Sequence, residues 1–234
     1  MSAAAQQVHI AFMGSTAMRE ALEALVPLYE QASGHKVGVT LHPASVVVAK
    51  IREAARLDLV MTSPANIDTL VKEGKLVADS RVDFVHSRVG VAVRAGAPKP
   101  DIGTEEAFMA ALFAARSVAI SQGPSGVHFM QAMQRLGVAD VIRAKAVIPD
   151  ISVRIGTVVA RGDAEIGIQQ IGELLPMPGI DYVGPLPDEL QSIIVYATAL
   201  PAGAKERAAA EALVKFLTSP QAAPILKKLG LDPA

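Results

Sequence analysis

The stretch VHIAFMGST at residues 8–16 decides the fold, because it joins a short apolar run to a small polar turn that leads into a helix. The apolar run predicts a buried strand. Apolar residues then recur at spacings of three and four, which predicts one face of a helix that ends at Gly34. The same order returns at residues 36–55 and 57–73. Repeated strand, turn and helix predict parallel strands joined by helical crossovers, so the expected fold class is α/β.

The second half of the chain repeats this theme after a long strand-like run at residues 82–94. Two such halves, joined again by a returning strand, predict a two-lobed protein with mixed sheets, flanking helices and an interlobe cleft. The remaining expected elements are a helix at 104–115, a strand at 117–120, a helix at 127–136, a helix at 152–160, a strand at 164–168, a loop at 176–187, a strand at 190–200 and two final helices, the second opening at 219–220.

Composition excludes several classes of function. Lys and Arg number 22 against 23 Asp and Glu, a net charge of −1, whereas nucleic-acid-binding proteins normally carry a basic excess. We therefore expect no nucleic-acid partner. The chain contains no cysteine, which excludes disulfides, thiolate nucleophiles and zinc–thiolate sites. The five histidines show no metal-binding spacing, so we expect neither a metal site nor a cofactor.

The beginning of the chain bears on its location. Residues 1–7 lack the positive and apolar regions of an intact signal peptide. A small-residue stretch is also what remains when a signal is removed and a start codon is added. A periplasmic and a cytosolic start both stay open on these residues alone.

Small hydroxyl residues follow each of the first three expected strands. They are Ser15 and Thr16 after Gly14, then Ser45, then Ser63. Because the carboxyl ends of parallel strands meet at one sheet edge, we expect these side chains to cluster where open α/β folds bind ligands. The alternative is that each hydroxyl only caps its helix.

Several motifs in this order resemble the type II periplasmic solute-binding proteins, and within them the molybdate-binding branch. The resemblance runs from residue 8 to about residue 233, and the branch also resembles aconitate isomerase, an enzyme on the same fold. It implies lobes of residues 1–83 with 193–234, and 84–192. The matching stretches are LEALVPLYE at 22–30, GHKV at 34–37, LDLV at 57–60, PSGVH at 124–128, VVARGDAEIGI at 158–168 and FLTSPQAA at 216–223.

The resemblance also implies a set of ligand-binding residues, because molybdate binders hold their oxyanion with hydroxyl and backbone N–H groups. Where the family has a tyrosine, this chain has Gln170, an amide that both donates and accepts. We therefore expect an organic acid to bind better than molybdate. The implied contacts are Gly14, Ser15 and Thr16, then Ser45, then Ser125 and Gly126, then a helix-start donor at Ser152 or Val153, and finally Gln170.

Charged and titratable candidates complete the predicted site. His128 lies three residues after Ser125, at an expected helix start, and Arg88 lies within an apolar run. A hydrolase Ser–His pair would need a nucleophile elbow and an orienting acid, which the sequence does not offer. We expect Gly126 to permit close approach of a ligand, so that Gly126→Val blocks binding without unfolding the protein.

Two function classes fit these residues. The first is a monomeric periplasmic protein that captures a small anion and delivers it to the membrane permease of an ABC transporter. The second is an isomerase of a small unsaturated tricarboxylate, with His128 as its catalytic base. A cytosolic ligand-binding regulatory domain is a third possibility, but it would need a DNA-binding module that this sequence lacks.

Overall fold

The computed structural model describes residues 7–53 and 55–234. Residues 1–6, most of the stretch considered above for a signal peptide, lie outside the described residues. The chain divides into two compact units, Met1–His86 with Val195–Ala234 and Ser87–Ile194. It passes from one unit to the other within β4 (Val82–Arg94) and again within β9 (Ile193–Ala199).

The sheet of unit 1 begins with the three strands that the sequence predicts. Its order is β2-β1-β3-β9, with β1 (His9–Ser15), β2 (Lys36–His42) and β3 (Leu59–Thr62). β1 runs parallel to both β2 and β3, whereas β9 is antiparallel to β3. Parallel strands with helical crossovers and one antiparallel strand confirm the expected α/β class with mixed sheets.

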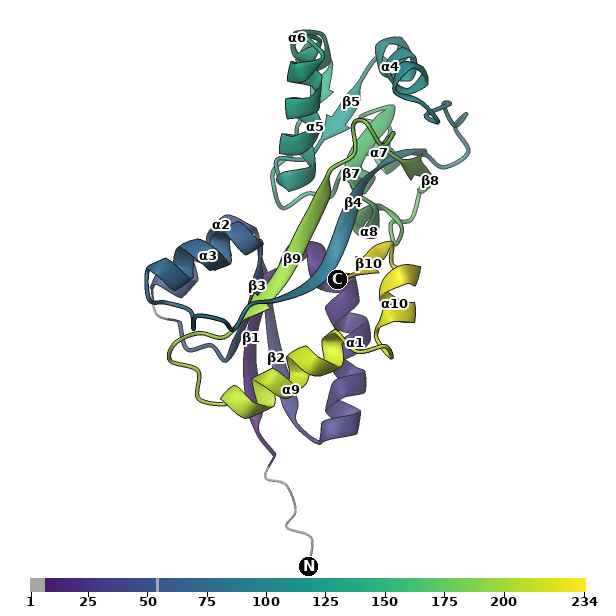
Figure 1. Cartoon of the computed structure of the whole chain (residues 1–234). Helices are drawn as coiled ribbons and strands as arrows, with labels where there is room; N and C mark the ends of the chain where they lie inside the picture. The colour runs from purple at the N-terminus through teal and green to yellow at the C-terminus, as the bar shows by residue number, and fades with distance from the viewer. Residues whose placement is uncertain (1–6, 54) are drawn as a thin grey trace, which may run out of the picture. The chain divides into compact units, whose positions relative to one another are not determined.

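The helices of unit 1 come from both of its chain segments. α1 (Arg19–Ser33) continues through Pro27 and ends at Gly34, whose φ of 76° is left-handed as expected for a cap. Figure 1 shows α1 beside α9 and α10, which come from the far end of the sequence. Burial of Tyr29 among these helices raises the pKa of its hydroxyl. The other elements are η1 (Thr16–Met18), α2 (Ala44–Arg52), α3 (Pro64–Lys72), α9 (Arg207–Leu217), α10 (Ala223–Lys228) and β10 (Leu231–Pro233).

A buried carboxylate fastens α9 to the sheet of unit 1. Asp58 is only 7% exposed. One of its oxygens accepts from the Ala11 N–H at 2.9 Å, and the other accepts from the N–H groups of Lys205 and Glu206 at 2.9 and 3.0 Å. Glu206 is the N-cap residue of α9, so the carboxylate satisfies donors at a helix start that has no side-chain cap of its own.

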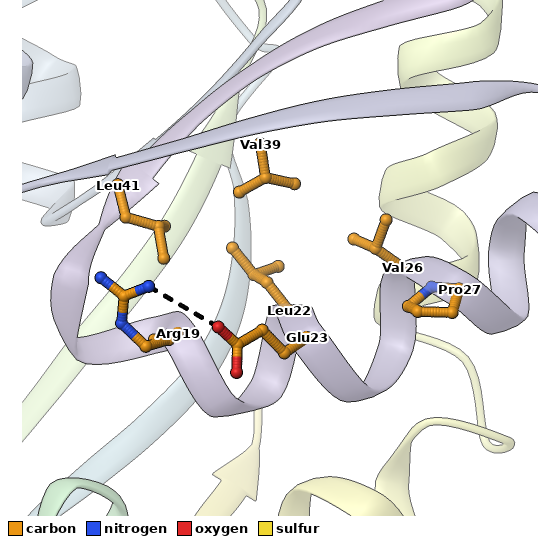
Figure 2. Close-up of a pocket in the computed structure, with 7 residues that line it drawn as sticks. All are labelled: Arg19, Leu22, Glu23, Val26, Pro27, Val39 and Leu41. Atoms are coloured by element: carbon orange, nitrogen blue, oxygen red, sulfur yellow. Dashed lines mark ion pairs between the residues drawn. The ribbon is translucent and has the colours of Figure 1, made fainter.

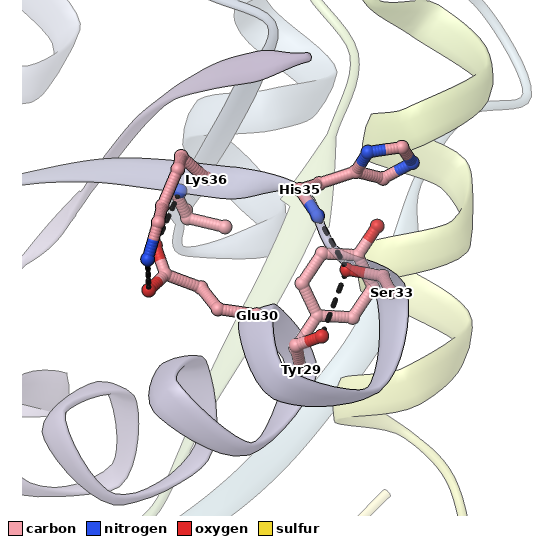
Figure 3. A network of polar contacts seen from close by, with 6 residues as sticks. Tyr29, Glu30, Ser33, His35 and Lys36 are labelled. Atoms are coloured by element: carbon pink, nitrogen blue, oxygen red, sulfur yellow. Dashed lines mark hydrogen bonds and ion pairs between the residues drawn. The ribbon is translucent and has the colours of Figure 1, made fainter. Parts of the chain in front are cut away.

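A second polar network fixes the turn between α1 and β2 (Figure 3). The Glu30 carboxylate accepts from the Val37 N–H at 2.8 Å and from the Lys36 ammonium at 2.9 Å. These bonds hold the pKa of Glu30 below its ordinary value. The Ser33 hydroxyl donates to the Tyr29 carbonyl at 2.8 Å, which closes the last turn of α1.

Unit 2 has its own mixed sheet. Its order is β4-β7-β5-β6, and β8 (Ile180–Pro185) also pairs with β4. β5 (Val118–Ile120) is parallel to both β6 (Ala146–Val147) and β7 (Ile166–Gln170), whereas β4 is antiparallel to β7 and β8. The carboxyl ends of β5, β6 and β7 therefore share one edge.

Helices cover both faces of this sheet. The first turn of α5 packs on the Ile120 side chain, so α5 covers the face that Ile120 occupies. α7 covers the opposite face, since Gly167 leaves room there for Val159 and Ile155. The helices of unit 2 are α4 (Glu105–Ala114), α5 (Pro124–Arg135), α6 (Ala139–Arg143), α7 (Ile155–Arg161) and α8 (Ile171–Leu174).

Some boundaries differ from the sequence predictions. The expected loop at 176–187 contains β8, because β4 offers a second edge to pair with. The expected helix at 127–136 begins three residues earlier, at Pro124, a residue suited to a first helical turn. The prediction that residues 219–220 open the last helix is wrong, since α10 begins at Ala223 after the N-cap Ala222.

Candidate functional site

The first turn of α5 holds the buried hydroxyl of Ser125. Ser125 is 1% exposed, and its Oγ has no hydrogen-bond partner among the described residues. The nearby N–H groups of Gly126 and Val127 both donate to the Gly123 carbonyl at 3.1 Å. A buried hydroxyl without a bond costs about 1–3 kcal/mol. α5 is twelve residues long, so its N-terminus also favours negative charge at this point.

Gln170 ends β7 at the same edge of the unit 2 sheet. It is 2% exposed and stands opposite Val89 in the β4–β7 register. Its Nε2 donates to a carboxylate oxygen of Glu173 at 3.1 Å. This bond turns the donor end of the amide toward Glu173 and the acceptor end away from it.

The predicted donor at Ser152 or Val153 is already engaged within its own turn. The N–H and hydroxyl of Ser152 both donate to one oxygen of Asp150, at 2.9 and 2.6 Å, and the Val153 N–H donates to the Asp150 carbonyl at 2.9 Å. The Ser152 hydroxyl and N–H lower the pKa of Asp150.

The prediction that a helix begins at Ser152 is wrong. The helix α7 begins only at Ile155, whose N–H donates to the Gln169 amide oxygen at 3.0 Å. Gln169 therefore satisfies the N–H at the observed start of α7, whereas the sequence predicted Ser152 or Val153 as the helix-start donor to a ligand. Neighbouring Gln169 and Gln170 point to opposite faces of the strand, which explains their different partners.

The two charged candidates of unit 2 are exposed. His128 lies in the first half of α5 on its solvent side. Arg88 alternates with Val89 along β4, so it lies on the face opposite to Gln170. There its charge opposes the rise in pKa that burial gives Tyr182 of β8.

The expectation for Gly126 needs correction. This glycine is buried, and a Cβ at its position would lie 1.7 Å from the Ser121 carbonyl oxygen, far inside van der Waals contact. Gly126 is therefore required for packing the β5–α5 turn. Gly126→Val would disrupt that turn rather than leave the fold intact, because the opposing atom is backbone.

The hydroxyl residues of unit 1 come from three neighbouring strand ends. The β1–β2 register sets Ser15 opposite His42, and β3 ends at Thr62 in parallel with β1. Ser15 caps η1 by accepting from the Ala17 N–H, and Ser63 caps α3 by accepting from the Asn66 N–H. Since a capping hydroxyl uses its oxygen as an acceptor, its O–H remains able to donate.

The other unit 1 candidates differ in exposure. Ser45 is exposed in the first turn of α2, where the sequence predicted a turn before the helix. Thr16 is half-buried in η1. Gly14 is buried, and a Cβ at its position would make ordinary van der Waals contacts with Leu41 and Leu22.

A pocket of about 400 Å³ lies between α1 and β2 (Figure 2). Its walls are mostly apolar, and its two charges, Arg19 and Glu23, pair with each other at 3.6 Å. None of the predicted site residues lines it. Neutralised charge and apolar walls give this pocket no feature of an anion site.

Comparison with known proteins agrees with the fold. Residues 10–232 match the family described as bacterial extracellular solute-binding protein. The chain belongs to this family. It is similar to an aconitate isomerase of Pseudomonas sp., with 37% identity over 89% of this chain and 82% of the relative. It is also similar to the molybdate-binding protein ModA of Azotobacter vinelandii, with 24% identity over 98% of this chain and 92% of that protein.

A solved structure of the periplasmic molybdate-binding protein of A. vinelandii superposes on this solute-binding protein with a TM-score of 0.79. That match covers 95% of this chain and 98% of the other at 22% identity, so it concerns the fold alone. Within the described part of the chain, no helix combines the length and the apolar character needed to cross a bilayer.

Sequence reasoning missed two polar residues at the edge of the unit 2 sheet in this solute-binding protein. The sequence prediction named Gln170 and not Gln169. Because neighbouring strand residues point to opposite faces, the two glutamines could have been expected to have different partners. Ser87 is fully buried in β4, and its hydroxyl has no hydrogen-bond partner among the described residues. Ser87 stands between His86 and Arg88 in the sequence, so no local pattern distinguished it.

Proposed function

We propose that this solute-binding protein captures a small organic acid and that the N-terminal turn of α5 binds a carboxylate of that ligand. The observation that carries the proposal is the buried Ser125 hydroxyl at the start of a long helix; this hydroxyl has no hydrogen-bond partner within residues 7–53 and 55–234. A carboxylate oxygen would accept from this hydroxyl and gain from the helix dipole. The family membership supports binding as the function. The Ser125 hydroxyl and the start of α5 support a carboxylate as the group that is bound.

The preference for an organic acid over a metal oxyanion rests on the polar groups around that turn. A tetrahedral oxyanion offers only acceptors, so it requires donors on every side. Gln170 instead directs its donor end to Glu173, and Ser152 gives both its donors to Asp150. Fewer donors are therefore left for a ligand that can only accept, which supports a ligand carrying hydroxyl or protonated carboxyl groups.

Calorimetric titration tests this proposal. We expect a tricarboxylate such as citrate or trans-aconitate to bind more tightly than molybdate or sulfate. Ser125→Ala should weaken binding by about 1–3 kcal/mol, roughly 5- to 150-fold in Kd. Ser152→Ala is the matched control, since the Ser152 hydroxyl already bonds Asp150. Tight molybdate binding with no response to any organic acid would overturn the ligand assignment.

We propose that the unit 1 hydroxyls form a second set of donors. Ser15 and Ser63 both cap helices through their oxygens and keep an O–H to donate. Ser15→Ala and Ser63→Ala should each lower affinity for the same acid as well as stability. If stability falls and the Kd of both variants stays at the wild-type value, the hydroxyls serve only as helix caps.

The 37% identity to an aconitate isomerase favours a second candidate, isomerisation of an unsaturated tricarboxylate. The step requires a base to remove an allylic proton, and His128 lies on α5 one turn beyond its start. Incubation with cis- or trans-aconitate, followed by chromatography, measures interconversion directly. Turnover that His128→Ala abolishes would support the enzyme, and wild-type protein without turnover would exclude it.

We further propose that the protein works in the periplasm and delivers its ligand to an ABC permease. Membership of the family described as bacterial extracellular solute-binding protein supports this location. Osmotic-shock fractionation of the native cells should release the protein with periplasmic markers. Recovery with cytosolic markers alone would contradict the proposal.

A further inference from the structure

Ser87 lies at the same edge and on the same face of the unit 2 sheet as the proposed carboxylate site. The β4–β7 register pairs Val89 with Gln170, and directly paired residues of adjacent strands share a face. Ser87 stands two residues before Val89 in β4, so its side chain points to that same face, just beyond the end of β7.

The start of α5 lies over this face as well. Ile120 pairs with Ile168 in the β5–β7 register, and Ile168 is two residues before Gln170. Gly126 packs directly on the Ile120 side chain. The topology therefore brings Ser87, Gln170 and the first turn of α5 to one edge and one face, although they are far apart in the sequence.

The Ser87 hydroxyl is the second buried and unbonded hydroxyl of unit 2. The residue is 0% exposed, and its Oγ has no hydrogen-bond partner among the described residues. Alanine would fit a fully buried strand position without the cost of an unsatisfied hydroxyl. A ligand that bonds this hydroxyl would supply the missing partner and remove the cost.

We propose that Ser87 is a further ligand-binding residue, whose hydroxyl hydrogen-bonds a second polar group of the organic acid held by Ser125. The inference rests on the proposed function and adds a specificity determinant to it. Ser87 would distinguish acids with a second carboxylate or hydroxyl from monocarboxylates. Because Ser87 and Ser125 are covered in this state, neighbouring groups must move before a ligand reaches them, so association should be slower than free diffusion.

Opposite effects on stability and affinity test the assignment. Ser87→Ala should leave the melting temperature of the ligand-free protein unchanged or higher, because it removes an unsatisfied buried hydroxyl. The same change should raise the Kd for citrate or trans-aconitate by roughly tenfold. Ser87→Cys keeps the shape with a weak donor and should lose affinity in the same way.

Ser117→Ala is the matched control in the same unit. The Ser117 hydroxyl accepts from the Glu165 N–H at 3.2 Å, at the opposite edge of the sheet. This variant should lower the melting temperature and leave the Kd unchanged, the reverse of Ser87→Ala.

The outcomes separate this inference from the proposed function. If wild-type protein and Ser87→Ala bind the tricarboxylate equally, the Ser87 role is overturned while the proposed function stands. If Ser87→Ala lowers the melting temperature together with affinity, Ser87 is structural and the inference is also overturned. If wild-type protein binds none of citrate, trans-aconitate, molybdate or sulfate, the proposed function itself fails.

Discussion

Replacing Asp58 with alanine should remove much of the stability of unit 1. The carboxylate accepts hydrogen bonds from the N–H groups of Ala11, Lys205 and Glu206 at 2.9, 2.9 and 3.0 Å, and it is 7% exposed. Bonds to a charged group contribute about 1.5–3 kcal/mol each. Because the three bonds share one acceptor group, they do not add fully, and we expect a loss of about 3–5 kcal/mol.

Urea unfolding followed by circular dichroism measures this loss. An unchanged slope of the unfolding free energy against urea concentration indicates that only the stability has changed. Asp58→Asn keeps one oxygen for the start of α9 and should cost less than Asp58→Ala. Asp68→Ala is the surface control, because its ion pair with Arg81 is exposed and contributes about 0–1 kcal/mol. A loss below about 1 kcal/mol for Asp58→Ala would refute the reasoning, since it would fall within the surface range.

Two further predictions concern the polar ends of helices. The Lys145 ammonium donates to three carbonyls at the end of α4, at 2.8–2.9 Å, so Lys145→Met should cost about 1–3 kcal/mol in thermal unfolding while Lys145→Arg costs less. Glu30 has a lowered folded pKa, so its stabilisation is present above the unfolded pKa and disappears as pH falls through the folded value. Glu30→Gln should therefore reduce the melting temperature at pH 7 and have little effect near pH 2; an equal effect at both values would contradict this sign.

The fold was predictable because its elements carry strong local signals. The strand at residues 82–94 has the predicted bounds, and Gly34 caps α1 as expected. β8 escaped prediction because its residues lie in a Pro- and Gly-rich segment, and only pairing with β4 makes them a strand. Tertiary pairing of this kind leaves no periodic trace in a single sequence.

The candidate site was less predictable than the fold. The sequence drew attention to Ser125, but only the structure reveals that its hydroxyl has no partner in the described part of the chain. The sequence equally suggested Ser152, whose donors are taken by Asp150. Both residues are serines near an expected helix start, so the sequence does not distinguish them. Whether a hydroxyl is free to bind a ligand depends on neighbours that come from elsewhere in the fold.

The discontinuity of unit 1 has a consequence for the order in which a ribosome delivers its parts. Residues 87–194 emerge complete before the last strand and helices of unit 1 exist, so unit 2 can fold first although it is second in the chain. Until residues 205 and 206 emerge, Asp58 has only one of its three donors. The amino-terminal segment of unit 1 therefore lacks two of the hydrogen bonds to Asp58 until the start of α9 has been synthesised.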